Sequence, residues 1–281
     1  MINSSCPATA HEVAEHYDEL DRYYREIWGE HVHHGLWERG NESVAEAVVN
    51  LVRAVARRGR ITKGMRVCDV GCGYGGTARI LDAEFGAAVT AITVSLAQYL
   101  HAITLRGDAR HPEYLLGDWL NNDLPSGAFD AVISVESSEH MPDKPTFFAQ
   151  AHRVLKTDGR MVVCAWLAAE NPTRWQRRHV LEPICREGRL PSMGTESEYR
   201  EWFSDAMLQV ESFEDVSANV RRTWSICLAR ILPALIRRPE YLRFLLNSRA
   251  RNRIFLITIA RIWCAYAVGA MRYGIFAARK V

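Results

Sequence analysis

The stretch VCDVGCGYGG, residues 67–76, decides the fold of this 281-residue chain. Its apolar start is typical of a buried strand. Gly71, Gly73 and Gly75 then allow the backbone to turn tightly after the strand and to approach a ligand closely. In an open α/β sheet, ligands lie beyond the carboxyl ends of the strands, where the strand order reverses. The stretch therefore predicts a small-molecule site directly after a strand of such a sheet.

Strand-like and helix-like segments alternate on both sides of this stretch. Strands are expected in seven apolar runs: MRVCDV, AAVTAITV, EYLLGD, FDAVISVES, GRMVVCAWLA, LQVESFEDVS and RYGIFAARK. Helical segments separate most of these runs, and this order is typical of a mainly parallel sheet with right-handed crossovers. The predicted fold is therefore α/β: a Rossmann-like, seven-stranded, mainly parallel sheet flanked by helices.

We predict three parts along the chain. Residues 1–60 form an N-terminal helical lid, residues 61–170 a cofactor-binding core, and residues 171–281 a helical substrate cap with the last strands of the sheet. The cap is rich in Trp, Leu, Ile and Phe, a composition that suits a lipophilic or aromatic substrate. Within it, Thr195 and Glu198 have the spacing of a capping box and predict a helix start.

Charge is divided unevenly along the chain. From Arg221 to Val281 there are 13 Lys and Arg against one acid, a net charge of +12, whereas the rest of the chain carries −10. Such asymmetry indicates either an anionic partner for the basic part or solvated helix faces that balance an acidic body.

Cysteine usage and the N-terminus indicate the cellular compartment. The seven cysteines follow no CxxC…CxxC pattern, so we interpret them as reduced thiols and expect no metal site. The first 20 residues are polar and acidic where a signal peptide needs an apolar segment. A cytoplasmic location is expected.

Two cofactors fit a glycine-rich loop after a strand: a dinucleotide and S-adenosylmethionine. A dinucleotide site usually has an acid about 20 residues further on, but the second strand here ends in Thr93 and Ser95. The acid instead precedes the glycines as Asp69, where it would attract the methionine ammonium group. Asp118 and Trp119 follow the third strand and could bind an adenine. The residues favour S-adenosylmethionine as the cofactor. The alternative is a different class of enzyme, an NAD-dependent oxidoreductase.

The chain resembles class I S-adenosylmethionine-dependent methyltransferases, and more narrowly the tocopherol methyltransferase family. The resemblance runs from about residue 17 to the C-terminus and is carried by six stretches: YYREIWGEHVHHGLW, VCDVGCGYGGTARIL, AITVSLAQ, SVESSEHMPDK, SANVRRTW and YGIFAARK. The glycine motif is specific only to the superfamily, whereas ESSEHMPDK and HVHHG are more specific. Plant indole-alkaloid N-methyltransferases are related, as are, further off, cyclopropane and mycolic acid synthases.

The resemblance implies functions for residues at the strand ends and in HVHHG, a segment that would fold over the cofactor. The implied cofactor-binding residues are Asp69, Gly71 and Gly73 at the methionine, Thr93 and Gln98 at the ribose, Asp118 and Trp119 at the adenine, and His33 near the sulfonium. The implied catalytic residues are His34, also near the sulfonium, and Glu136, which would face the methyl group. Gln98 could equally be an ordinary exposed helix residue.

Methyl transfer from a sulfonium is an in-line displacement that moves positive charge from sulfur to the acceptor. A hydroxyl acceptor must also lose a proton, and histidine titrates near neutrality, so His140 is the expected base. Glu136 could orient this base, or stabilise a carbocation if the acceptor is a carbon. The alternative for His140 is a structural hydrogen bond that pins its loop.

The expected acceptor is a small lipophilic molecule, aromatic or prenylated, from secondary, quinone or isoprenoid metabolism, methylated at carbon, nitrogen or oxygen. One departure from the family pattern is the pair Arg221 and Arg222, which stands where an apolar pair is expected. Further arginines follow: Arg237, Arg238, Arg249, Arg251 and Arg253. Guanidinium groups grip phosphates, so a prenyl diphosphate C-methyltransferase is one alternative. An anionic membrane from which the acceptor is drawn is another, and plain solvation of the arginines is the third.

Other partners are limited by the sequence. No D/N-P-P-Y-type loop follows the fourth strand, and the basic residues alternate with apolar ones, so we expect no nucleic acid. The N-terminal helix, with Tyr17, Tyr23 and Tyr24, could close over the substrate or swap into a second subunit of a homo-oligomer.

Overall fold

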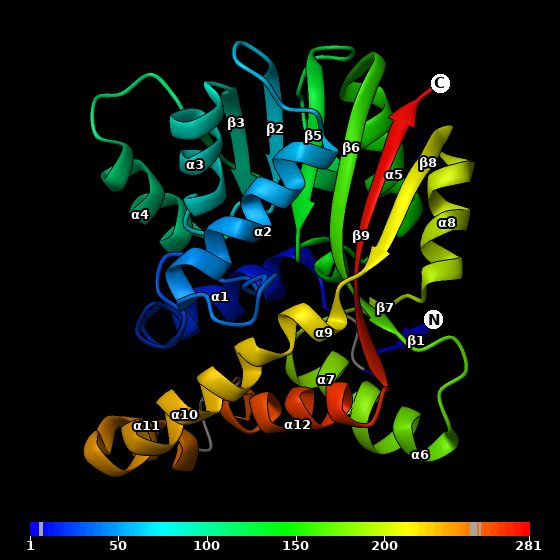
Figure 1. Ribbon diagram of the computed structural model, residues 1–281. Coiled ribbons are helices and arrows are strands. Elements are labelled where there is room, and N and C mark those ends of the chain that lie inside the picture. The colour runs from blue at the N-terminus through cyan, green and yellow to red at the C-terminus, as the bar shows by residue number, and fades with distance from the viewer. Residues whose placement is uncertain (6–7, 248–251, 253) are drawn as a thin grey trace.

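A computed structural model of the chain shows an open sheet with helices on both faces (Figure 1). It describes residues 1–281 apart from 6–7, 248–251 and 253. In the described residues, the sheet has seven strands: β2 (Arg66–Val70), β3 (Ala88–Thr93), β4 (Glu113–Leu116), β5 (Phe129–Val135), β6 (Leu155–Ala168), β8 (Leu208–Asp215) and β9 (Met271–Lys280). Strand β9 runs antiparallel to both its neighbours, β6 and β8, and the other neighbouring pairs of this sheet are parallel. The predicted α/β fold with a seven-stranded, mainly parallel sheet is confirmed.

Helices cover both faces because successive side chains of a strand point to opposite sides. In β2, Val67 belongs to one hydrophobic cluster and Cys68 to the other. The helices on the Val67 side are α2 (Val44–Arg58), α3 (Gly76–Phe85) and α4 (Leu96–Arg106), and those on the Cys68 side are α5 (Lys144–Val154) and α8 (Glu196–Asp205). The capping box predicted at Thr195 and Glu198 is present at the start of α8.

The strand order reverses next to β2. The sheet order is β4-β3-β2-β5-β6-β9-β8, so the chain moves outward from β2 to β4 and then returns to β5 on the other side of β2. The loops after β2 and β5 therefore diverge and leave a crevice at the carboxyl ends of the strands. The glycine loop follows β2 and Glu136 follows β5, so both sequence motifs lie at this crevice.

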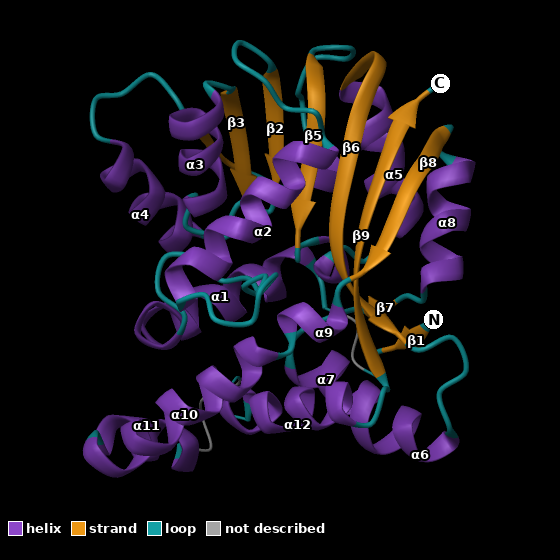
Figure 2. Cartoon of the chain, viewed as in Figure 1, coloured by secondary structure: helices purple, strands orange, loops and turns teal. Residues whose placement is uncertain are grey.

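Helix α1 (Ala10–Ile27) lies between the carboxyl ends of the strands and a layer of further helices (Figure 2). This layer comes from two insertions. The elements after β6 are α6 (Arg174–Gln176), the π-helical turn η3 (Arg177–Leu181) and α7 (Glu182–Glu187), and those between β8 and β9 are α9 (Ser217–Val220), α10 (Arg222–Arg237), α11 (Pro239–Leu246) and α12 (Phe255–Ala267). We call these elements the cap; the division at residues 60 and 170 stays a prediction. None of the described helices combines the length and the apolar character needed to cross a bilayer.

Candidate functional site

Two cavities meet at the carboxyl ends of the strands. The sheet cavity, about 710 Å³, is lined at the strand ends by Gly71, Gly73, Thr93, Gln98, Asp118 and Trp119. The cap cavity, about 560 Å³, is lined from α1, β6, α7, α10 and α12 by Tyr24, Trp28, Trp166, Ile184, Trp224 and Ile262. Four residues line both cavities and form the partition between them: Tyr17, Val32, Glu136 and His140. The site thus has two compartments that share one layer of side chains.

The loop after β2 requires glycine at the crevice. Gly71 has φ +75° and Gly73 has φ +56°, both in the left-handed region that other residues rarely adopt. A Cβ atom on Gly71 would stand only 2.2 Å from the Cβ atom of Ser137, which follows β5. The loop can therefore pass close to β5 and keep its backbone open toward the sheet cavity.

Asp69, near the end of β2, is a buried carboxylate, and one of its two oxygens has no hydrogen-bond donor among the described residues. Asp69 is 1% exposed, and its Oδ2 is the oxygen without a hydrogen-bond partner in the described part of the chain. Burial raises the pKa of this carboxyl to about 7. Asp69 lines a small side pocket together with Gly71, Gly73 and His33. An ammonium group there would supply both the missing donor and a positive charge, which fits the amino-acid end of S-adenosylmethionine.

The other predicted cofactor residues line the sheet cavity. Thr93 Oγ1 donates to Gln98 Oε1 at 2.9 Å and both side chains are buried, so Gln98 is not the exposed helix residue of the alternative interpretation. Among the described residues no acceptor is found for the amide NH₂ of Gln98, so it could donate to the ribose that we predict there. Trp119 is fixed because its indole N–H donates to the backbone oxygen of Phe147 at 3.1 Å. Asp118 lies beside it in the same lining, where we predict the adenine.

Glu136 accepts four hydrogen bonds in the partition. Oε1 accepts from the backbone N–H of His34 at 2.7 Å and from the hydroxyl of Tyr273 at 2.8 Å. Oε2 accepts from Nδ1 of His34 at 2.9 Å and from Nε1 of Trp166 at 2.8 Å. Burial alone would raise the pKa of Glu136, but the side chain of His34, then His33 and the His34 backbone N–H outweigh it and lower this pKa to about 2. Glu136 is therefore a fixed negative charge at neutral pH.

Glu136 also has an unusual backbone conformation. Its φ of +55° lies in the left-handed region, which costs a residue with a Cβ atom roughly 1–2 kcal/mol. Such strain persists where the surrounding structure overcomes it, and it is common at functional sites. Here the four hydrogen bonds hold the carboxylate in the partition.

His34 is held on both sides of its ring. An indole N–H can only donate, so Nε2 of His34 accepts from Nε1 of Trp224 at 2.7 Å. The imidazole proton is therefore on Nδ1, which donates to Glu136. His33 lies apart, with Nδ1 donating to the backbone oxygen of His34 at 2.8 Å, and it faces the side pocket of Asp69. In this geometry His34 supports the carboxylate of Glu136, and His33 lies in the side pocket with Asp69, where we predict the methionine end of the cofactor.

His140 presents a free-base nitrogen to the partition. It lies at the end of η2 (Ser138–His140), and Nδ1 donates to the backbone oxygen of Arg189 at 3.3 Å. Nε2 must then accept, and it accepts from the hydroxyl of Tyr17 at 2.8 Å. Burial lowers the pKa of His140 to about 4, so the imidazole is neutral near pH 7. A hydroxyl that replaced that of Tyr17 would meet a nitrogen able to take its proton.

Several site residues were not identified from the sequence. Trp166 and Tyr273 are directly opposite each other across β6 and β9, and both donate to Glu136. The alternation within the run GRMVVCAWLA could have placed Trp166 on a face, but the register of β9 is not a local signal. Tyr17 was expected only on a helix that closes over the site, without its partner His140.

Fold and site together define a class of protein. The reversal of strand order next to β2, the buried acid ahead of the glycines and the lack of an acid at the end of β3 all fit S-adenosylmethionine. The class is that of S-adenosylmethionine-dependent methyltransferases.

Known proteins agree with this class. The profile of the mycolic acid cyclopropane synthetase family matches residues 5–238. The chain is 30% identical over 300 residues to the chloroplastic tocopherol O-methyltransferase of Arabidopsis thaliana, covering 99% of this chain and 84% of that one. It is also 30% identical to the 2-methyl-6-phytyl-1,4-hydroquinone methyltransferase of Synechocystis sp., over 95% of this chain and 86% of the other.

A solved structure has the same fold. The mycolic acid cyclopropane synthase CmaA1, complexed with SAH and CTAB, superposes with a TM-score of 0.82 at 20% identity, covering 99% of this chain and 100% of that one. The present chain belongs to the mycolic acid cyclopropane synthetase family. It is an S-adenosylmethionine-dependent methyltransferase of small lipophilic molecules, as the sequence predicted, and not the NAD-dependent oxidoreductase of the alternative.

Proposed function

We propose that this methyltransferase acts on a lipophilic phenol or hydroquinone, bound in the cap cavity with its hydroxyl against His140. The observation that supports this most strongly is the hydrogen bond from Tyr17 to Nε2 of His140 in the partition between the cavities. The side chain of Tyr17 is itself a phenol, so a phenolic acceptor can take its place at the same nitrogen. Two relatives are named for a tocopherol and for a phytyl hydroquinone.

The lining of the cap cavity suits a ring with an apolar tail. Tyr24, Trp28 and Trp224 offer aromatic faces, and Ile184 and Ile262 offer aliphatic contact. No lysine or arginine belongs to the described lining, so no ammonium or guanidinium group is present there to bind a diphosphate.

The arginines that raised the prenyl diphosphate alternative lie elsewhere. Four are exposed and line neither cavity: Arg221, Arg222, Arg237 and Arg238. Three are outside the described residues: Arg249, Arg251 and Arg253. The described geometry therefore favours an acceptor without phosphate.

Each residue of the partition has a part in the proposed reaction. S-adenosylmethionine, when bound in the sheet cavity, supplies a methyl group on a positively charged sulfur. His140 takes the proton of the acceptor hydroxyl, which raises the electron density on its oxygen and on neighbouring ring carbons. Transfer to oxygen needs no further proton loss. Transfer to carbon gives a dienone whose ring proton must also leave, so the protonated His140 returns its proton to the oxygen and then takes the proton of the ring carbon. Glu136 stabilises the positive charge that passes from the sulfonium to the protonated His140, and His34 keeps its carboxylate in place.

The acceptor class can be tested by mass spectrometry of products formed with a methyl-labelled donor. A prenylated hydroquinone, a simple phenol and a prenyl diphosphate are compared at equal concentration. We expect label in the hydroquinone, less in the phenol and none in the diphosphate. Label confined to the diphosphate would overturn the proposed acceptor class.

Finer expectations about partners and location stay predictions: a cytoplasmic location, contact with an anionic membrane through the arginine-rich part, and self-association. The last of these included a swap of the N-terminal helix into a neighbour. In the structure, α1 lines both cavities of its own chain, which supports the closing function.

A further inference from the structure

Helix α12 exposes apolar side chains where a surface helix normally carries polar ones. Its 13 residues include one charge, Arg261. On its outer side, Ile257 is 54% exposed and Trp263 is 47% exposed. On its inner side, Ile262 is buried and lines the cap cavity. The helix is thus apolar on both sides, although only one side faces the interior.

The exposed apolar area continues onto the neighbouring helices. Nε1 of Trp263 donates to Oγ of Ser225 on α10 at 3.1 Å, so the outer sides of α10 and α12 meet. Ile236, near the end of α10, is 85% exposed, and Leu246 of α11 is 71% exposed. Figure 1 shows the three helices at the end of the molecule farthest from the sheet. We call this area the outer cap surface, and its apolar residues are Ile236, Leu242, Leu246, Ile257 and Trp263.

The same helices are strongly basic. Arg237 and Arg243 are exposed beside the apolar residues. The one acid between residues 221 and 281 is Glu240, which is paired with Arg22 of α1. The outer cap surface therefore combines exposed aliphatic and indole side chains with an excess of positive charge.

Only some partners match both properties. A second copy of the chain that docked through the same surface would bring the same positive charge against it and be repelled. A uniformly acidic protein would match the arginines but leave the apolar residues without a complement. A bilayer with anionic headgroups offers negative charge at its surface and hydrocarbon just beneath it.

We propose that the outer cap surface docks on an anionic lipid bilayer, with α12 in the interface and the arginines at the headgroups. This docking builds on the proposed function, since the inner sides of α10 and α12 line the cap cavity through Trp224 and Ile262. One layer of helices then separates the bilayer from the bound acceptor. A lipophilic acceptor dissolved in the bilayer could reach the cavity without crossing water.

Vesicle flotation tests the docking. The full chain is mixed with phosphatidylcholine vesicles that contain or lack phosphatidylglycerol, at low and high salt. We expect binding to the anionic vesicles and weaker binding at high salt. The double variant Ile236→Glu/Ile257→Glu should lower the vesicle-bound to free ratio about tenfold or more, because two apolar anchors are lost. The matched control Leu100→Glu/Leu105→Glu changes two exposed leucines of α4 and should bind like the wild type.

Two outcomes would overturn the docking. One is a lack of binding by the wild type, or equal binding by the wild type and Ile236→Glu/Ile257→Glu. The other is a dimer in analytical ultracentrifugation that this variant dissociates, because the surface would then join two copies. Turnover of a short, water-soluble phenol should be the same in all these proteins. This assay separates a failure of docking from a failure of the proposed function.

Discussion

Asp69 links cofactor binding to the stability of the protein. Its pKa is raised from 3.8 to about 7 because the carboxyl is buried and its Oδ2 has no donor among the described residues. The folded chain therefore binds this proton more tightly than the unfolded chain. The resulting stabilisation is complete below about pH 4 and is lost as pH rises through 7. A bound ammonium group reverses the effect, because it favours the charged form.

Asp69→Asn should consequently stabilise the ligand-free protein at pH 8 while removing affinity for S-adenosylhomocysteine. The gain in the free energy of unfolding should be at most roughly 4 kcal/mol, from about three pKa units at 1.36 kcal/mol each. Urea denaturation and calorimetry measure the two effects. The control is the same comparison at pH 5, where the gain should fall to roughly 1.6 kcal/mol, because only the unfolded wild type is then ionised, about 1.2 pH units above its pKa of 3.8. A variant no more stable than the wild type at pH 8 would contradict this.

His140→Gln tests the proposed base. We expect kcat to fall about 10²- to 10⁴-fold with little change in the affinity for S-adenosylhomocysteine. Because the pKa of His140 is lowered to about 4, the base stays unprotonated above pH 5, and the wild-type rate should show no acidic limb near pH 6.5. His152→Gln, on the outer side of α5, is the control. An acidic limb at pH 6.5 that disappears in His140→Gln would show that the imidazole is not held neutral.

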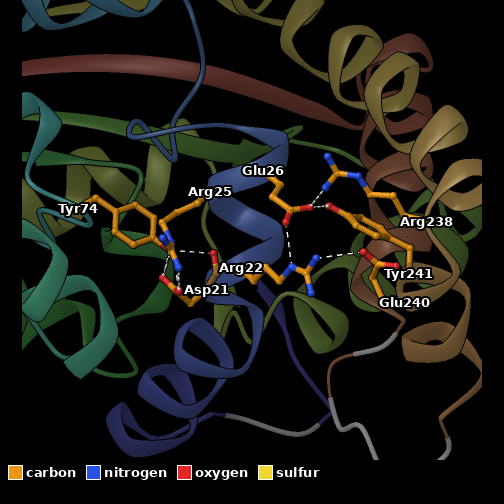
Figure 3. Close-up of polar contacts among 8 residues, drawn as sticks. All are labelled: Asp21, Arg22, Arg25, Glu26, Tyr74, Arg238, Glu240 and Tyr241. Atoms are coloured by element: carbon orange, nitrogen blue, oxygen red, sulfur yellow. Dashed lines mark hydrogen bonds and ion pairs between the residues drawn. The ribbon is translucent and has the colours of Figure 1, made fainter.

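Helix α1 connects the glycine loop to the cap, as Figure 3 shows. Toward the glycine loop, Asp21 accepts from the hydroxyl of Tyr74 at 2.8 Å and pairs with Arg25. Toward the cap, Glu26 accepts from three side chains: Arg22, Arg238 and Tyr241. Since α1 also lines the sheet cavity through Ala10, Val13 and Tyr17, these contacts hold one wall of that cavity in place.

Glu26→Gln should therefore loosen α1. We expect a loss of about 1 kcal/mol in the free energy of unfolding, since several partly exposed partners share one carboxylate, and faster release of S-adenosylhomocysteine. Urea denaturation and stopped-flow fluorescence give the two values. Glu84→Gln is the matched control, because Glu84 pairs only with Arg53 among the described residues and lies away from α1. Equal release rates in both variants would refute a coupling through α1.

At the scale of elements, the sequence predicted what local patterns encode. The alternation of apolar runs and helical segments placed all seven strands of the sheet and the helices around it. It could not predict the small antiparallel pair β1 (Ile2–Asn3) and β7 (Ser192–Met193), because two-residue strands carry no periodicity. The four donors to Glu136 were also beyond it, since they come from residue 34, β6 and β9, and only the folded chain brings these together.

The whole molecule should respond to a nucleoside thioether and not to a dinucleotide. S-adenosylhomocysteine at a hundred times its Kd should raise the free energy of unfolding by about 2.7 kcal/mol. NADH at the same concentration should have no effect, because no acid at the end of β3 can bind its ribose. Thermal unfolding with each ligand measures this. Stabilisation by NADH alone would contradict the cofactor assignment.

The placement of the cofactor residues was easier to predict than the partition. Asp69, Gly71 and Thr93 stand directly at strand ends, so the order of strands already groups them. The partition instead joins α1, residue 32 and the loop after β5, and its geometry depends on how the cap closes. The role of Tyr17 at His140 could be seen only in the assembled molecule.

The phenol of Tyr17 seated against Nε2 of His140 has a consequence for the resting enzyme. In the proposed reaction, the ring of Tyr17 occupies the proton-accepting nitrogen of His140 until an acceptor takes its place. Each turnover would then begin with the exchange of one phenol for another, and an enzyme without acceptor would keep this base covered.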